Sequence, residues 1–163
     1  MTRPNDGKKE DYDTATFYSI SNCQEGLSRV TLGNFLIKRV VYELQEELPD
    51  VKNFGTLSPM QGFADWVKSS ENDKISEIVQ KDNFVKVEFL KSLDLKIGDR
   101  KFIDNKDLLT KLALNYLAVQ KNDLGFPIND VCRFHLKNGA EIDDIVVNAN
   151  VSDVGFKRSF GIM

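Results

Sequence analysis

The chain has few of the residue types on which common protein sites depend. Its 163 residues include one histidine, His135, and two cysteines, Cys23 and Cys132. A structural zinc site is usually built from four Cys and His ligands, so this set excludes a site of the usual kind. The two cysteines lie far apart and form no CxxC motif. We therefore expect both to be thiols in a reducing compartment.

Excess positive charge and long apolar runs are also missing. The formal net charge is −3, and no basic stripe of the kind that marks a nucleic-acid surface is present. No apolar run approaches the roughly 20 residues that span a bilayer. Residues 1–11 have no apolar core, and the last three residues are no peroxisomal signal. We expect no nucleic-acid or membrane partner, and the cytosol is the default compartment.

Apolar residues are abundant enough to form a core. They make up 41% of the chain and include 11 phenylalanines, a composition typical of a folded protein. The length corresponds to one domain or part of one. We expect residues 1–14 to be a polar, disordered lead-in and residues 15–163 to form the domain.

The pattern of apolar and polar residues predicts alternating strands and helices. We expect strands over 16–20 and 51–58, and helices over 34–48, 63–68, 74–80 and 107–119, the last capped by Asp107. Residues 81–105 are rich in charged side chains, and this composition predicts a surface insertion. After a turn at 125–127, we expect a strand with His135 near its end, a hairpin turn at Asn138-Gly139, and a returning strand to Val147. This order predicts an α/β or α+β fold.

Two side chains are candidates for acid–base chemistry. The imidazole of His135 is the one group whose ordinary pKa lies near neutral pH, although a histidine between Phe134 and Leu136 is more often structural. Ser58 follows a predicted strand and precedes Pro59, where a hydroxyl either faces a cleft or stabilises a turn. The sequence around Ser58 is not a GxSxG elbow, so a hydrolase triad has no direct support.

The segment from Gln24 to Asn34 is a candidate phosphate site. It joins a predicted strand to a predicted helix, and free N–H groups at a helix start attract phosphate. Gly26 and Gly33 are too far apart for a Walker or dinucleotide motif. A plain loop before a capped helix is the alternative interpretation.

Together, these segments resemble the C-terminal catalytic domain of the malonyl-CoA decarboxylase family. The resemblance covers residues 15–60 and 107–163, and residues 64–106 match poorly. It lies in ATFYSISNCQEGL at 15–27, VTLGNFLIKRVV at 30–41, TLSP at 56–59, RFHLKNGA at 133–140, NVS at 150–152 and SFGIM at 159–163. Several motifs in the same order are far more specific than any one of them.

The resemblance implies a fold, a reaction and a set of site residues. The fold would be part of an acetyltransferase-like (GNAT-type) mixed sheet flanked by helices. The reaction would convert malonyl-CoA to acetyl-CoA and CO2, without metal or organic cofactor. By position, the family's proton acceptor is Ser58 and its proton donor is His135, and both contact the substrate. The positions that would bind coenzyme A are Ser28, Arg29, Val30, Thr31, Leu32, Gly33 and Asn34.

The chain also departs from the family pattern. Arg29 stands where relatives usually have Gly, Thr31 where some have Glu, Asp130 where Pro is usual and Cys132 where Ala is usual. Arg29 either blocks the approach of a phosphate or adds a positive charge to it. Relatives have a further helical N-terminal domain, through which they form homo-oligomers, and additional strands, so we expect a truncated catalytic domain. Relatives occur in mitochondria, peroxisomes and cytosol.

Two alternatives to a decarboxylase follow from the same residues. The first is a non-catalytic fragment that binds coenzyme A, which Arg29 favours. The second is an acyl-CoA-dependent acyltransferase on the same fold. The segments around Ser58 and His135 argue against the acyltransferase, because they resemble decarboxylases.

Overall fold

The computed structural model describes residues 12–18, 32–69 and 106–163, together with residues 75, 77–79, 87–88 and 91. For residues 32–34 it describes the backbone alone. The chain divides into two compact units, residues 1–57 and residues 58–163, and each is described by itself.

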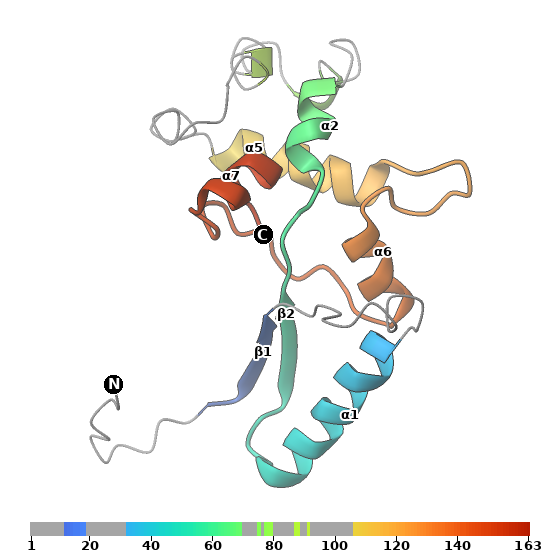
Figure 1. Cartoon of the computed structure of the whole chain (residues 1–163), viewed down its shortest axis with the longest axis vertical. Coiled ribbons are helices and arrows are strands. Elements are labelled where there is room, and N and C mark those ends of the chain that lie inside the picture. Colours follow the sequence, from blue (N-terminus) through green and yellow to red (C-terminus); the bar gives the residue numbers. More distant parts are fainter. Residues whose placement is uncertain are drawn as a thin grey trace. The chain divides into compact units, whose positions relative to one another are not determined.

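The first unit contains two parallel strands joined by a helix. Strand β1 (Thr14–Tyr18) pairs with strand β2 (Asn53–Leu57), in a register that places Thr14 opposite Asn53, and helix α1 (Leu32–Glu47) lies between them in the sequence (Figure 1). Parallel neighbours need a long crossover connection, and α1 is part of it. The rings of Phe17 and Phe54 stack across the pair with centroids 6.4 Å apart. Both predicted strands are confirmed, the first one two residues earlier than predicted.

Helix α1 confirms the helix predicted over 34–48. Its half-buried side chains recur every three or four residues and form one stripe, made of Ile37, Val40, Val41 and Leu44. On the exposed side, Arg39 forms an ion pair with Glu43 at 2.7 Å, one turn further along the helix. The helix ends at Glu47, two residues before Pro49.

The second unit is helical and holds the main core. It contains α2 (Phe63–Ser69), α5 (Lys106–Leu114), the π-helix η3 (Asn115–Val119), α6 (Asp130–Lys137) and α7 (Asp153–Ser159) (Figure 1). Phe63 is fully buried, and its ring lies 5.6 Å from Tyr116 and 5.9 Å from Phe160 between centroids. Other buried members of this core are Val67, Leu108, Leu109, Leu112 and Ile162.

Most predicted helices of the second unit are confirmed. The 63–68 helix is α2, and the 107–119 helix is α5 continued by η3. The predicted cap at Asp107 is wrong, because α5 already begins at Lys106 and Asp107 lies in its first turn. Ile75, Glu77 and Ile78 are helical and Val79 lies in a bend. Residues 74, 76 and 80 and most of residues 81–105 lie outside the described residues.

The predicted strand around His135 is wrong, because His135 lies in helix α6. Asn129 starts this helix by accepting a hydrogen bond from the Cys132 N–H. Asn138 and Gly139 end it rather than forming a hairpin turn, and Gly139 has φ +86°. An Asn-Gly pair suits both places, since glycine accepts the positive φ that follows a helix as readily as that of a hairpin.

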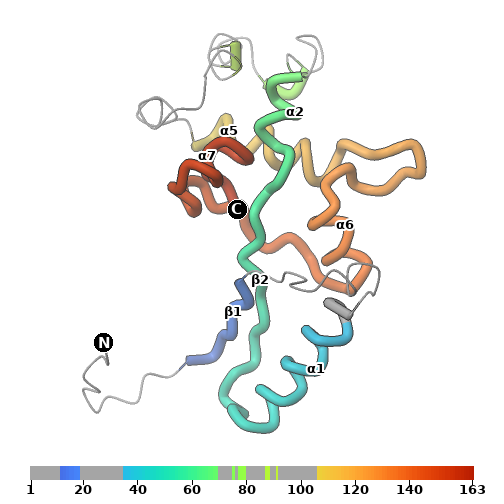
Figure 2. The backbone as a smooth tube through the Cα atoms, viewed as in Figure 1, coloured from blue at the N-terminus to red at the C-terminus, as the bar shows by residue number. Residues whose placement is uncertain are grey.

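The predicted returning strand after Gly139 is also wrong. The segment around Val146 pairs instead with the last residue of the chain, through two backbone hydrogen bonds between Val146 and Met163 of 2.9 and 3.1 Å. Figure 2 shows the C-terminal end beside this segment. A small parallel sheet with separate helices makes the chain a mixed α+β protein, as predicted. No helix among the described residues is long and apolar enough to cross a membrane.

Candidate functional site

The two predicted acid–base residues are hydrogen-bonded to each other. Ser58 Oγ lies 3.3 Å from Nε2 of His135, although the two residues are 77 positions apart in the sequence. Both belong to the second unit, and both side chains are half-buried. The tautomer of the imidazole decides which atom donates the proton. The fold thus brings together the two residues to which the family resemblance assigns the roles of proton acceptor and proton donor.

Ser58 is held by a tight turn directly after β2. Pro59 follows it, and the restricted φ of proline limits the directions that the chain can take. The Gln61 N–H donates to the Pro59 carbonyl at 3.0 Å, and Gly62 reverses the chain with φ +80°. Met60 is buried and anchors the turn in the core. The hydroxyl of Ser58 is therefore carried by a constrained segment.

His135 is held by a short helix, α6, whose start is buried. The helix begins after Asn129, which is 3% exposed, and Cys132 in its first turns is also buried. The ring edge of Phe134 and the ring of His135 meet at nearly a right angle, with centroids 5.1 Å apart. Arg133 donates to the Pro127 carbonyl at 2.9 Å and pairs with Asp130 on the outer side of the helix. These contacts fix the imidazole on the side of α6 that meets Ser58.

Burial lowers the pKa of His135 below its ordinary value of 6.5. Burial disfavours the charged imidazolium, and the surroundings do not restore it. The imidazole is therefore neutral at pH 7, with one nitrogen that donates a hydrogen bond and one that accepts. A neutral imidazole next to a hydroxyl is able to pass a proton in either direction.

We expect the ring signals of His135 to titrate below pH 6.5 in an NMR experiment on the folded chain. His135 is the only histidine, so the imidazole signals need no assignment. Because the pKa of His135 is lower in the folded state than its ordinary value of 6.5, the unfolded state binds the proton first as the pH falls below about 6.5. Stability should therefore be full above pH 6.5 and fall as the pH drops through the folded pKa. His135→Gln should remove this part of the pH dependence, and a titration above pH 6.5 would contradict the burial argument.

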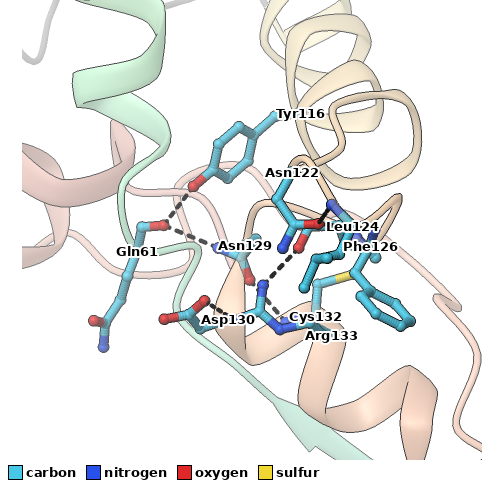
Figure 3. A network of polar contacts seen from close by, with 10 residues as sticks. Gln61, Tyr116, Asn122, Leu124, Phe126, Asn129, Asp130, Cys132 and Arg133 are labelled. Atoms are coloured by element: carbon cyan, nitrogen blue, oxygen red, sulfur yellow. Dashed lines mark hydrogen bonds and ion pairs between the residues drawn. The ribbon is translucent and has the colours of Figure 1, made fainter.

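A network of partly buried hydrogen bonds joins the Ser58 turn to the start of α6. The backbone carbonyl of Gln61 accepts one hydrogen bond from the Tyr116 hydroxyl and another from Nδ2 of Asn129, each at 2.9 Å (Figure 3). Oδ1 of Asn129 accepts from the Cys132 N–H at 2.8 Å. Burial raises the pKa of Tyr116, so its hydroxyl keeps its proton and donates. The role of Asn129 was not predicted, because a strand was expected where α6 lies. Tyr116 lies in the predicted 107–119 helix, but no local pattern in the sequence indicates its bond to Gln61.

The predicted coenzyme A positions are only partly described. Leu32, Gly33 and Asn34 form the first turn of α1, in agreement with the predicted loop-to-helix junction. Ser28, Arg29, Val30 and Thr31 lie outside the described residues. Free N–H groups of the first helical turn are the donors that a phosphate would need.

Across the part of the chain that the structure describes, no group of three His, Cys, Asp or Glu side chains is placed to hold a metal ion. Cys132 is a buried free thiol, as predicted, and burial raises its pKa. Cys23 lies outside the described residues.

The paired serine and histidine on an α+β chain have the elements of an acid–base site. Comparison with known proteins identifies the family of the chain. Residues 2–163 match the malonyl-CoA decarboxylase C-terminal domain family. The chain therefore belongs to this family. The match includes residues 64–106, where the motif resemblance was poor. The boundary at residues 14 and 15 stays a prediction.

Curated relatives agree with this family. The chain is 36% identical over 178 residues to the mitochondrial malonyl-CoA decarboxylase of Anser anser anser. This match covers 94% of the chain and 34% of the relative. It is 36% identical over 168 residues to the mitochondrial malonyl-CoA decarboxylase of Rattus norvegicus, covering 91% of the chain and 34% of the relative. The chain thus spans about a third of the length of these relatives.

A solved structure of malonyl-CoA decarboxylase from Rhodopseudomonas palustris has a similar fold. It is 38% identical to the chain with a TM-score of 0.75, and the match covers 94% of the chain and 35% of that protein. The malonyl-CoA decarboxylase from Cupriavidus metallidurans gives 35% identity and a TM-score of 0.73, with coverage of 93% and 41%.

Proposed function

We propose that the chain carries the acid–base residues of a malonyl-CoA decarboxylase and converts malonyl-CoA to acetyl-CoA and CO2. The observation that carries this proposal is the 3.3 Å contact between Ser58 Oγ and His135 Nε2 in a chain of this family. The activity is proposed because the chain spans only about a third of its curated relatives.

The proposed reaction has a simple electron balance. The bond between the malonyl carboxylate and the adjacent CH2 group breaks, and CO2 leaves. The electron pair of that bond moves into the thioester as an enolate, and one proton added to the carbon gives acetyl-CoA. The thioester carbonyl itself accepts the electrons, so the proposed route needs neither a metal nor an organic cofactor. Hydrogen-bond donors placed at the developing enolate oxygen are typically worth about 3–4 kcal/mol each.

His135 and Ser58 have complementary roles in this proposal. The neutral imidazole of His135 donates a hydrogen bond to the enolate oxygen and then delivers the proton to the carbon. Ser58 contacts the departing carboxylate, and its hydroxyl returns a proton to the imidazolate that this step leaves. Water then reprotonates the Ser58 oxygen and becomes hydroxide, which balances the proton consumed in forming acetyl-CoA. The lowered pKa of His135 supports this scheme, because burial also limits competing contact with solvent.

We also propose that the loop leading into α1 binds the pyrophosphate of coenzyme A and that the fold is a partial GNAT-type domain. The loop positions are Ser28, Arg29, Val30, Thr31, Leu32, Gly33 and Asn34. The start of α1 at Leu32 supports the phosphate site, because free N–H groups are found at that end of a helix. In this proposal the guanidinium of Arg29 adds positive charge beside a phosphate.

The purified chain should release acetyl-CoA from malonyl-CoA in a coupled assay. Acetyl-CoA release that requires His135 would support the decarboxylase. Saturable binding of coenzyme A without turnover would instead support the non-catalytic alternative, and transfer of an acyl group to an added amine would support the acyltransferase. Either of these two results would overturn the proposed decarboxylase activity.

Ser58→Ala should lower kcat for malonyl-CoA by roughly 10²-fold, because the carboxylate contact and the proton path both depend on the hydroxyl. Ser69→Ala is the matched control, since Ser69 is an exposed serine of the same unit and donates to the Trp66 carbonyl at 3.3 Å. Steady-state assays of both variants decide the matter. Equal activities of Ser58→Ala and Ser69→Ala would remove Ser58 from the mechanism.

A further inference from the structure

A buried asparagine links the two segments that carry the acid–base pair. We propose that Asn129 is a positioning residue, which fixes the Ser58 turn against the start of α6 and thereby sets the distance between Ser58 and His135. The link itself follows from the structure, whereas its effect on turnover rests on the proposed function.

The oxygen and the nitrogen of the Asn129 carboxamide each form a hydrogen bond, and the two partners belong to different segments. Oδ1 accepts from the Cys132 N–H at 2.8 Å, which starts α6. Nδ2 donates at 2.9 Å to the carbonyl of Gln61, three residues after Ser58. The first bond requires an oxygen and the second requires an N–H group, so the two partners fix the orientation of the carboxamide. Asn129 is only 3% exposed, so the loss of either bond would leave a buried polar group without a hydrogen-bond partner.

The geometry makes the acid–base pair sensitive to this link. The Ser58–His135 contact of 3.3 Å is already long for a hydrogen bond, so a shift of about 1 Å between the two segments would break it. α6 carries Asn129 at its start and His135 on its second turn, and a helix transmits such a shift as a rigid element. The Tyr116 hydroxyl donates to the same carbonyl and gives the turn a second support (Figure 3).

Capping alone does not require an asparagine here. Helix α7 is capped by Ser152, whose Oγ accepts from the Gly155 N–H at 3.0 Å and donates to Asn150 only two residues away. Serine and asparagine cap helices about equally well. A serine at position 129 would lack the Nδ2 group that donates to the Gln61 carbonyl. Asn129→Ser therefore keeps the cap and removes the link.

The decisive experiment is a double-mutant cycle read from the NMR titration of the single histidine, on the full chain. Ser58→Ala should shift the pKa of His135 by removing the contact at Nε2. In the Asn129→Ser background, the same substitution should shift the pKa by half as much or less, because the contact is already loosened. Ser152→Ala is the matched control, and there Ser58→Ala should have its full effect. Equal shifts in all backgrounds would show that Asn129 is only a helix cap.

Asn129→Asp provides a second route if Asn129→Ser does not fold. A carboxylate oxygen still accepts from the Cys132 N–H and keeps the α6 cap, whereas the donor to the Gln61 carbonyl is lost. We expect Ser58→Ala to shift the pKa of His135 less in this background than in the original chain. An undiminished shift would overturn the proposal in the same way.

Turnover tests the catalytic consequence separately. Asn129→Ser should lower kcat for malonyl-CoA roughly 10-fold with little change in KM, and should add no further loss to His135→Ala. If the original chain does not turn over malonyl-CoA, the proposed function fails while the NMR cycle still decides the role of Asn129. A normal pKa coupling with a lowered kcat would likewise overturn the positioning role.

Discussion

Replacing His135 with alanine should lower kcat for malonyl-CoA by about 10²–10⁴-fold, the usual contribution of a positioned general acid. The imidazole is the only side chain of its type in the chain, so no second histidine is available to replace it. In the proposed mechanism, the substitution removes both the hydrogen bond to the enolate oxygen and the proton that completes acetyl-CoA. KM should change little, because the proposed contacts to coenzyme A lie elsewhere, in residues 28–34.

The control for this prediction lies on the same helix. Lys137 is exposed and places its ammonium group 4.4 Å from the ring centroid of Phe126. Lys137→Ala should therefore retain near-normal kcat while changing the same α6 segment. Both variants are compared by initial rates of acetyl-CoA release, with circular dichroism as the check on folding. A folded His135→Ala variant within about 10-fold of the original rate would remove His135 as the proton donor.

The lowered pKa of His135 suits a hydrogen-bond donor. A carboxylate substrate near an imidazole would raise its pKa towards the ordinary value. The pKa of the free protein and the pKa in the complex should therefore differ, with the higher value in the complex. Because burial lowers the pKa of His135, the imidazole is neutral in the free protein. A neutral imidazole keeps one N–H donor and carries no positive charge that would attract other anions.

Sequence patterns predicted the elements whose signals are long and regular. Helix α1 carries apolar residues over four turns and stops before Pro49, and both signals are local. Helix α6 has only eight residues, and its Asn138-Gly139 end also suits a hairpin. Local preference leaves these two structures close in energy, and the buried side chain of Asn129 favours the helix through a contact with Gln61, a segment distant in the sequence.

The acid–base pair was predictable for a different reason. Ser58 and His135 were found from the order of several motifs, whereas their contact bridges 77 residues and has no local signature. Asn129 and Tyr116 carry no motif of their own, since their roles arise from meeting at one carbonyl in the folded core. Residues that act directly on a substrate leave a pattern in short motifs, but residues that hold the site together are seen only once the segments are packed.

The largest effect on stability is expected at Gly155, in the first turn of α7. A Cβ atom there would lie 2.6 Å from Nδ2 of Asn150 and closer still to its Cγ and Oδ1. That carboxamide has little freedom to move, because Oδ1 accepts from the N–H of Ser152 at 3.2 Å and from its hydroxyl at 2.6 Å. The backbone of Asn150 is also bonded to the Gly161 carbonyl at 3.0 Å.

Two opposing effects decide whether Gly155→Ala raises or lowers the free energy of unfolding: the helix preference of alanine and the clash with Asn150. Alanine in a helix is favoured over glycine by roughly 0.5–1 kcal/mol. Overpacking a tight contact costs about 1–3 kcal/mol, and each hydrogen bond of Asn150 lost in relieving the clash costs about 1 kcal/mol more. The clash is therefore larger, and we expect a net loss of about 2–4 kcal/mol in the free energy of unfolding.

Urea unfolding monitored by circular dichroism measures this loss directly. Gly55→Ala is one control, because among the described residues no atom beyond its chain neighbours lies within 4 Å of the added Cβ. Val154→Ala is the second, because Val154 is 56% exposed and adjoins Gly155 in α7. Both controls should stay within about 0.5–1 kcal/mol of the original chain, as surface or uncrowded positions do. Unchanged or increased stability of Gly155→Ala would mean that Asn150 moves aside without cost, and that the helix preference for alanine decides the outcome.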